Sequence, residues 1–219
     1  MAEVENSKDL ISVLWSGADI LRSKMDANEY KDYLLGIVFY KYLSDSFLIK
    51  VYDLIYDEKP ENLMAALDAY REALEDESAG ELQEQLRSDF HYVIEPELTY
   101  TCFAEEARNN AFQREQLQKA FNNIEQSDPL FADLFTDIDL YSNRLGTGDQ
   151  KQSDTIANLI LEIDKADLLD SDAEILGNAY EYLIGQFASE TGKKAGEFYT
   201  PQAVSKILTK IAIAGQEDK

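Results

Sequence analysis

The sequence has almost no cysteine or histidine, with one residue of each in 219. A lone Cys102 cannot form an internal disulfide, and it excludes a zinc site built from several cysteines. His91 on its own equally excludes a metal site built from several histidines. Cys102 is therefore expected to be a small, buried hydrophobic residue, and His91 to lie at the surface or at a helix end.

Proline and glycine are also scarce, with four and ten residues. Because turn-forming residues are few, long helices are favoured over many short strands. The apolar content of 45% is enough for a sizeable core, and the length allows one large domain or two small ones.

Long apolar runs are missing as well. The longest mostly apolar stretch, residues 30–49, is interrupted by four charged side chains, so no membrane-spanning helix is expected. Residues 1–5 are acidic, and no apolar segment typical of a signal peptide follows them. The chain is therefore expected in the cytoplasm.

Positive charge is in short supply, because 20 lysines and arginines face 43 aspartates and glutamates, a net charge of −23. Residues 53–90 hold 12 acidic side chains against three basic ones. Such a chain is repelled by the phosphate backbone of nucleic acids unless its basic residues are segregated. The acidic stretch is interpreted as a solvated helical surface, a face for a basic partner subunit, or a mimic of DNA charge.

Tyrosines and lysines occur together in the first quarter of the chain. Tyr33, Tyr40 and Tyr42 lie beside Lys31 and Lys41. Aromatic rings combined with basic side chains are typical of surfaces that bind nucleic acid. Tyrosines are also common in cores and interfaces, so the sequence leaves both interpretations open.

Apolar residues recur at helical spacing along most of the chain. This pattern predicts helices over about 7–25, with Ser7 as N-cap, and over 28–54, 63–74, 81–90, 104–126 and 153–163, then one after Asp170–Asp172 and one after Pro201. Residues 129–148 are predicted to form an aromatic loop. Residues 91–103 are rich in strand-forming side chains but contain Pro96, which predicts an extended loop or a small hairpin. The fold class is therefore mainly all-α, a multi-helix bundle with at most a small β-hairpin near 91–103.

The segment Gly196–Pro201 precedes the last predicted helix. Thr200 can cap a helix N-terminus, and Pro201 suits the first helical position, where no N–H is needed. A helix N-terminus attracts a carboxylate or phosphate, although a capped loop leading into a core helix has the same pattern.

Two sets of motifs resemble a known family. The runs 14–22, 29–31, 35–39 and 41–45 are similar to the helical N-terminal domain of the methylation subunit of type I restriction-modification systems. The later runs 176–183 and 187–201 resemble the junction between that domain and the methyltransferase domain.

The resemblance implies a function for the parent protein. Such a subunit transfers a methyl group from S-adenosylmethionine to the N6 amino group of adenine in double-stranded DNA. Two methylation subunits join one specificity subunit, and nuclease subunits complete the complex. The helical domain helps to hold the specificity subunit and to close around DNA. The residues that correspond to the cofactor site of the family are Glu197, Phe198, Tyr199, Thr200, Pro201 and Gln202.

The sequence departs from the family in its catalytic motif. An Asn-Pro-Pro-aromatic loop holds the flipped adenine in such enzymes, but none of the four prolines here is adjacent to another. The cluster Gly146–Gly148 is a weak substitute for a glycine-rich cofactor turn. We therefore expect residues 1–190 to be an interaction domain and residues 191–219 to be a linker and the first helix of a truncated methyltransferase domain, without catalytic residues or activity of its own. The alternative is a free-standing acidic interaction protein that mimics DNA charge.

Overall fold

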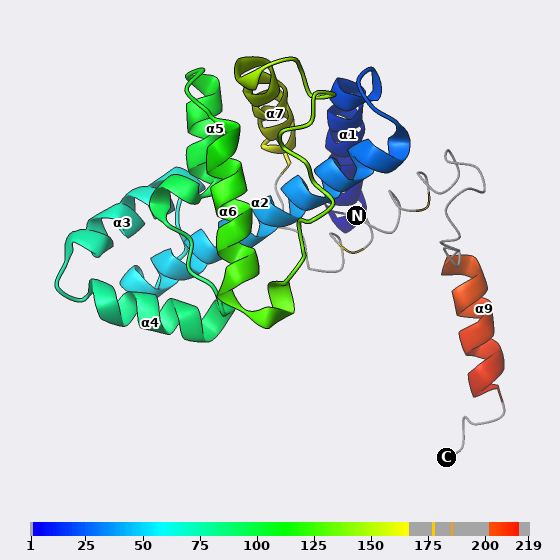
Figure 1. Cartoon of the computed structure of the whole chain (residues 1–219). Coiled ribbons are helices and arrows are strands. Elements are labelled where there is room, and N and C mark those ends of the chain that lie inside the picture. The colour runs from blue at the N-terminus through cyan, green and yellow to red at the C-terminus, as the bar shows by residue number, and fades with distance from the viewer. Residues whose placement is uncertain (1, 167–176, 178–184, 186–201, 215–219) are drawn as a thin grey trace.

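The computed structural model describes residues 2–166, 177, 185 and 202–214, and within these residues every regular element is helical (Figure 1). The elements are α1 (Ala2–Arg22), α2 (Ala27–Tyr56), α3 (Leu63–Glu75), α4 (Ala79–Phe90), the 3-10 helix η1 (Pro96–Leu98), α5 (Tyr100–Arg108), α6 (Arg114–Ser127), the 3-10 helix η2 (Pro129–Phe131), α7 (Asp149–Ile163) and α9 (Gln202–Ile213). The predicted all-α bundle is confirmed.

Helix α2 is the central element, and Figure 1 shows it running through the middle of the bundle. It contacts α1, α3, α4 and α5. A helix with apolar residues around most of its circumference must be covered on several sides, which explains this position. Its N-terminus is fixed by a capping box between Asp26 and Glu29, and it ends at Tyr56, followed by Asp57 as a C-cap in a left-handed conformation.

Two glycines of the family motifs allow close packing around α2. A Cβ atom on Gly17 would lie 2.9 Å from Leu34 and 3.0 Å from Leu159, so this glycine lets α1 approach α2 and α7. A Cβ atom on Gly36 would lie 2.1 Å from the Cδ1 atom of Ile138. Gly36 therefore leaves the space that Ile138 of the 129–148 loop occupies.

A buried ion pair within α2 lies beside the start of α5. Lys41 and Asp45 are 3% and 1% exposed, and the Lys41 ammonium donates to Asp45 Oδ2 at 2.5 Å. The same ammonium lies 5.1 Å from the centre of the Tyr100 ring. Ser44 Oγ accepts the Tyr100 N–H at 2.8 Å. The polar residues of the 41–45 motif thus fix the start of α5 against α2.

The loop over residues 129–148 packs tightly on the helices, and its prediction as a loop is confirmed. The Tyr33 hydroxyl donates to the Asp139 carbonyl at 2.6 Å. The rings of Phe121 and Phe135 stack with their centres 4.0 Å apart. Lys24 Nζ donates to the Leu145 carbonyl at 3.0 Å. The loop is therefore part of the core and not a surface appendage.

The hairpin alternative for residues 91–103 is wrong. His91 ends α4 in a left-handed conformation, residues 92–95 form an extended connection, and Pro96 opens η1. The Thr99 hydroxyl then accepts the Cys102 N–H at 3.3 Å, so Thr99 is the N-cap of α5. Capping and burial of the aromatic side chains outweigh the strand propensity of this segment.

Two predicted helix boundaries also differ. Helix α1 begins at Ala2, so Ser7 lies within the helix and is not its cap. The single helix predicted over 104–126 is two helices, because Asn110 adopts a left-handed conformation after α5. Gln113 and Gln116 form a capping box that starts α6. The helix predicted after Asp170–Asp172 lies outside the described residues.

Candidate interaction site

The predicted cofactor residues fall almost entirely outside the described part of the chain. Glu197, Phe198, Tyr199, Thr200 and Pro201 are not among the described residues, and Gln202 is the first residue of α9. The helix predicted after Pro201 is confirmed. Its apolar side chains Val204, Ile207, Leu208 and Ile211 are between 44% and 67% exposed. The cofactor site itself stays a prediction.

Of the two interpretations left open for the tyrosines and lysines of α2, core packing holds for three of the five side chains. Tyr33, Tyr40 and Lys41 are all buried. The Tyr40 hydroxyl donates to the Leu98 carbonyl at 2.7 Å, and burial raises the pKa of Tyr40 well above its ordinary value. These side chains therefore hold helices together, as the all-round apolar pattern of α2 indicates.

Asp164 marks the end of the described bundle. It follows α7 directly, lies 3.9 Å from the Lys41 ammonium, and forms an ion pair with Arg108. The Tyr100 hydroxyl donates to the Ile160 carbonyl at 2.8 Å in the same region. The polar contacts of Lys41 thus reach from α2 through α5 to the C-terminal end of α7.

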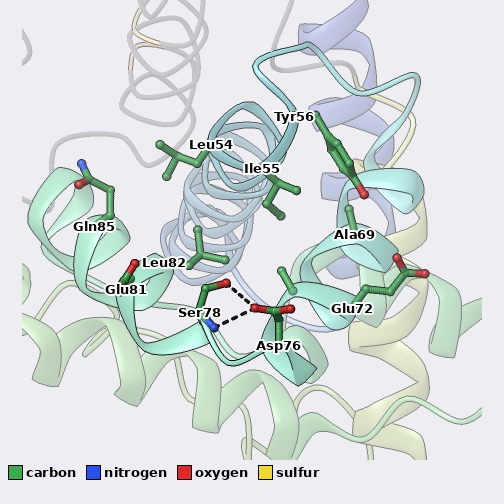
Figure 2. Close-up of a pocket in the computed structure, with 11 residues that line it drawn as sticks. Leu54, Ile55, Tyr56, Ala69, Glu72, Asp76, Ser78, Glu81, Leu82 and Gln85 are labelled. Atoms are coloured by element: carbon green, nitrogen blue, oxygen red, sulfur yellow. Dashed lines mark hydrogen bonds between the residues drawn. The ribbon is translucent and has the colours of Figure 1, made fainter.

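A groove lies where the end of α2 meets α3 and the start of α4 (Figure 2). Its volume is about 650 Å³. The apolar lining is Leu54, Ile55, Tyr56, Ala69, Ala73 and Leu82, and the polar lining is Glu72, Asp76, Ser78, Glu81 and Gln85. We call this feature the α2–α3–α4 groove.

The turn between α3 and α4 forms one end of the groove. Asp76 Oδ1 accepts the Ser78 N–H at 2.9 Å and the Ser78 hydroxyl at 2.7 Å, as the dashed lines in Figure 2 show. These hydrogen bonds favour the charged carboxylate and lower the pKa of Asp76. Asp76 therefore stays ionised to a lower pH than an ordinary aspartate.

The surface around the groove is strongly acidic. Of the 12 acidic side chains in residues 53–90, all but Asp53 are exposed. Arg71 pairs with Asp68 at 3.2 Å, and Lys50 pairs with Asp53 at 2.9 Å. The remaining carboxylates give this end of the bundle an excess of negative charge, which the sequence predicted but could not locate around a groove.

The two lone residues noted in the sequence lie where expected. Cys102 is buried, and burial is the main reason that its pKa is raised to about 11, so its thiol is a poor nucleophile at neutral pH. His91 is an exposed helix-end residue that lies 3.4 Å from Asp128.

Among the described residues, no three His, Cys, Asp or Glu side chains could together hold a metal ion. None of the helices described is long and apolar enough to cross a membrane.

Comparison with known proteins decides the family. Residues 10–163 match the HsdM N-terminal domain. The chain belongs to the HsdM N-terminal domain family. Residues 171–219 match a second family, N-6 DNA Methylase, so the HsdM domain is followed by the start of a methylase region. The domain boundary predicted between residues 190 and 191 stays a prediction.

Relatives and a solved structure agree with this assignment. The chain is 28% identical to the type I restriction enzyme MpnII methylase subunit of Mycoplasma pneumoniae, over 94% of this chain and 39% of that protein. It is 32% identical to the MjaVIII methylase subunit of Methanocaldococcus jannaschii, over 92% of this chain and 31% of that protein. A crystal structure of a type I restriction-modification methyltransferase subunit from Streptococcus thermophilus is 50% identical, with a TM-score of 0.89 over 97% of this chain and 45% of that one.

The HsdM-type chain therefore corresponds to the N-terminal part of a type I methylase subunit, and it spans less than half the length of the relatives it matches. The motifs that carried the resemblance now have a structural explanation. Gly17 and Gly36 allow close packing, Lys41 and Ser44 contact Tyr100 at the start of α5, and Asp45 pairs with Lys41.

Proposed function

We propose that this chain is the partner-binding part of a type I DNA adenine-N6 methyltransferase subunit. In this proposal it docks the specificity subunit and helps to close the complex around double-stranded DNA in the cytoplasm. A second methylation subunit and nuclease subunits complete the assembly. The observation that carries the proposal is the order of the two family matches, 10–163 and then 171–219, in one chain.

The proposal assigns the chemistry to segments outside the helical domain. S-adenosylmethionine would supply the methyl group, with Glu197, Phe198, Tyr199, Thr200, Pro201 and Gln202 contributing to its pocket. The adenine must leave the base stack before its amino group can react, and a loop beyond these residues would hold it. The helical domain supplies binding surface, so residues 1–219 are not catalytic alone.

Electrostatics supports a protein partner for the acidic end of the domain. A surface with eleven exposed carboxylates in residues 53–90 repels the DNA backbone. It attracts basic protein surfaces and speeds their association at low salt. DNA would therefore be enclosed mainly through the assembled complex, with this end of the helical domain directed toward protein.

The test compares residues 1–219 with the full-length subunit. Both are incubated with S-adenosylmethionine carrying a labelled methyl group, DNA and the specificity subunit. The expected result is methyl transfer by the full-length protein only, with calorimetry showing cofactor binding to the full-length protein and little or none to residues 1–219. Tight cofactor binding or methyl transfer by residues 1–219 would contradict this division of labour.

A further inference from the structure

We propose that the α2–α3–α4 groove docks a basic amphipathic helix of a partner subunit. The inference rests on the proposed function, because it identifies a docking surface of that assembly and the chemistry of its occupant. Its basis is the combination of an exposed apolar floor with a carboxylate rim, both contributed by ordered helices.

The floor of the groove exposes large apolar side chains at the end of α2. Leu54 is 36% exposed and Tyr56 is 48% exposed. The Tyr56 ring packs against the Tyr52 ring, with the ring centres 4.7 Å apart, so its position is supported from within α2. Leu82 of α4 lines the same hollow (Figure 2). Apolar side chains spaced at i, i+3, i+4 and i+7 on a partner helix would cover this floor.

The rim of the groove carries negative charge from two helices and the turn between them. Glu72 lies on α3, Asp76 on the α3–α4 turn and Glu81 on α4, and all three side chains are exposed. Among the residues that the structure describes, no arginine or lysine lines the groove. Lysine or arginine side chains that flank the apolar face of a bound helix would meet these carboxylates, which gives the occupant its basic character.

The walls of the groove are held before binding. Asn62 caps α3 by accepting the Ala65 N–H at 2.9 Å, and Asp76 and Ser78 fix the α3–α4 turn. Ala69 of α3 lines the groove and is itself buried, and Leu86 of α4 is buried in the core. Because these walls are already ordered, they lose little conformational entropy when a helix binds. The affinity of the groove for a partner helix is correspondingly higher.

The experiment uses a fluorescent 18-residue synthetic helix with leucines on one face and lysines on the other, and residues 1–219 as the binding protein. Fluorescence anisotropy should show binding that weakens as salt is added. The variant Glu72→Gln/Glu81→Gln should weaken binding roughly fivefold, because two exposed charge contacts are lost. The matched variant Glu61→Gln/Glu84→Gln has the same net charge but changes carboxylates outside the groove, and should change affinity less than about twofold.

The apolar floor of the groove is tested with a second pair of variants, one inside the groove and one outside it. Leu54→Ser should weaken peptide binding, whereas Leu130→Ser, which changes a side chain that is 81% exposed and outside the groove, should leave it unchanged. Circular dichroism confirms that each variant keeps its helices. Equal losses in the two charge variants, no loss in either, or unchanged binding by Leu54→Ser would overturn the groove as the site.

The proposed function is tested separately by methylation with the full-length subunit and its specificity subunit. Methylation without peptide binding overturns the groove and leaves the proposed function in place. Peptide binding without methylation leaves the groove in place and counts against the proposed function.

Discussion

Lys41 and Asp45 are the first and last residues of the 41–45 motif in α2, and both are buried. Their ion pair is buried, Lys41 lies against the Tyr100 ring, and Asp164 approaches the same ammonium. Charged residues in a motif can also form a binding surface, and the sequence left that interpretation open for the tyrosines and lysines of α2. Spacing alone could not exclude that, because burial of Lys41 depends on α5 and α7, which come much later in the chain.

The buried pair gives a prediction on stability. Lys41→Met removes the ammonium that neutralises the buried Asp45 carboxylate, so the free energy of unfolding should fall by about 3 kcal/mol. The matched variant Lys50→Met removes the partner of Asp53 on the same helix, at a half-exposed site, and should lose less than about 1 kcal/mol. Urea denaturation measures both. Similar losses of unfolding free energy in the two variants would show that the buried Lys41–Asp45 pair contributes no more to stability than the half-exposed Lys50–Asp53 pair.

Asp76 gives a prediction on pH. The Ser78 N–H and hydroxyl lower the pKa of Asp76 in the folded state, so their contribution to stability is present above the unfolded pKa and is lost as the pH falls through the folded pKa. Ser78→Ala removes the hydroxyl and should raise the pKa of Asp76 toward its ordinary value of about 3.8. Carbon-detected NMR titration of the carboxylate measures the shift. An unchanged pKa would mean that the backbone N–H alone sets it.

At the scale of elements, helices with a regular apolar stripe were predictable, and their junctions were not. Helices α2, α3, α4 and α7 were predicted from periodicity to within a few residues. The break between α5 and α6 was missed although the pair Asn109–Asn110 carries a signal for it, since asparagine takes the left-handed conformation more readily than most residues. Thr99 shows the reverse case, where a capping residue was present but the strand-forming side chains around it dominated the interpretation.

Gly36 gives a prediction on the contact between α2 and the 129–148 loop. A methyl group at this position would overlap Ile138, so Gly36→Ala should lower the free energy of unfolding by about 1–3 kcal/mol despite its better helix propensity. Gly80→Ala is the control, because nothing lies within 4 Å of its added Cβ atom, and it should be neutral or stabilising by up to about 1 kcal/mol.

A coupling measurement separates the Ile138 contact from other effects of the substitution. In the double variant Gly36→Ala/Ile138→Ala the loss should be smaller than the two single losses added together, because the overlap is removed. Urea denaturation of the four proteins gives this coupling. If the two single losses of unfolding free energy simply add up in the double variant, the Gly36→Ala loss does not come from overlap with Ile138.

At the scale of the whole molecule, the all-α fold, the acidic surface and the family were predicted from the sequence. The family prediction depended on motifs that occur in the same order in two separate parts of the chain. The α2–α3–α4 groove was not predictable, because it forms only where three helix ends meet. Membership of the HsdM N-terminal domain family, followed by a methylase match, favours the subunit interpretation over a free-standing mimic of DNA charge. The cofactor residues 197–202 stay a prediction.

The central claim is that this helical domain binds the specificity subunit. Sedimentation of residues 1–219 mixed with a specificity subunit from the same restriction-modification system, at about 10 μM each and moderate salt, tests it most directly, since a complex with a dissociation constant of about 1 μM is mostly assembled at that concentration. The account predicts a faster-sedimenting complex that contains both proteins and weakens as salt is raised. Two species that sediment independently, while circular dichroism shows the helical domain to be folded, would contradict it.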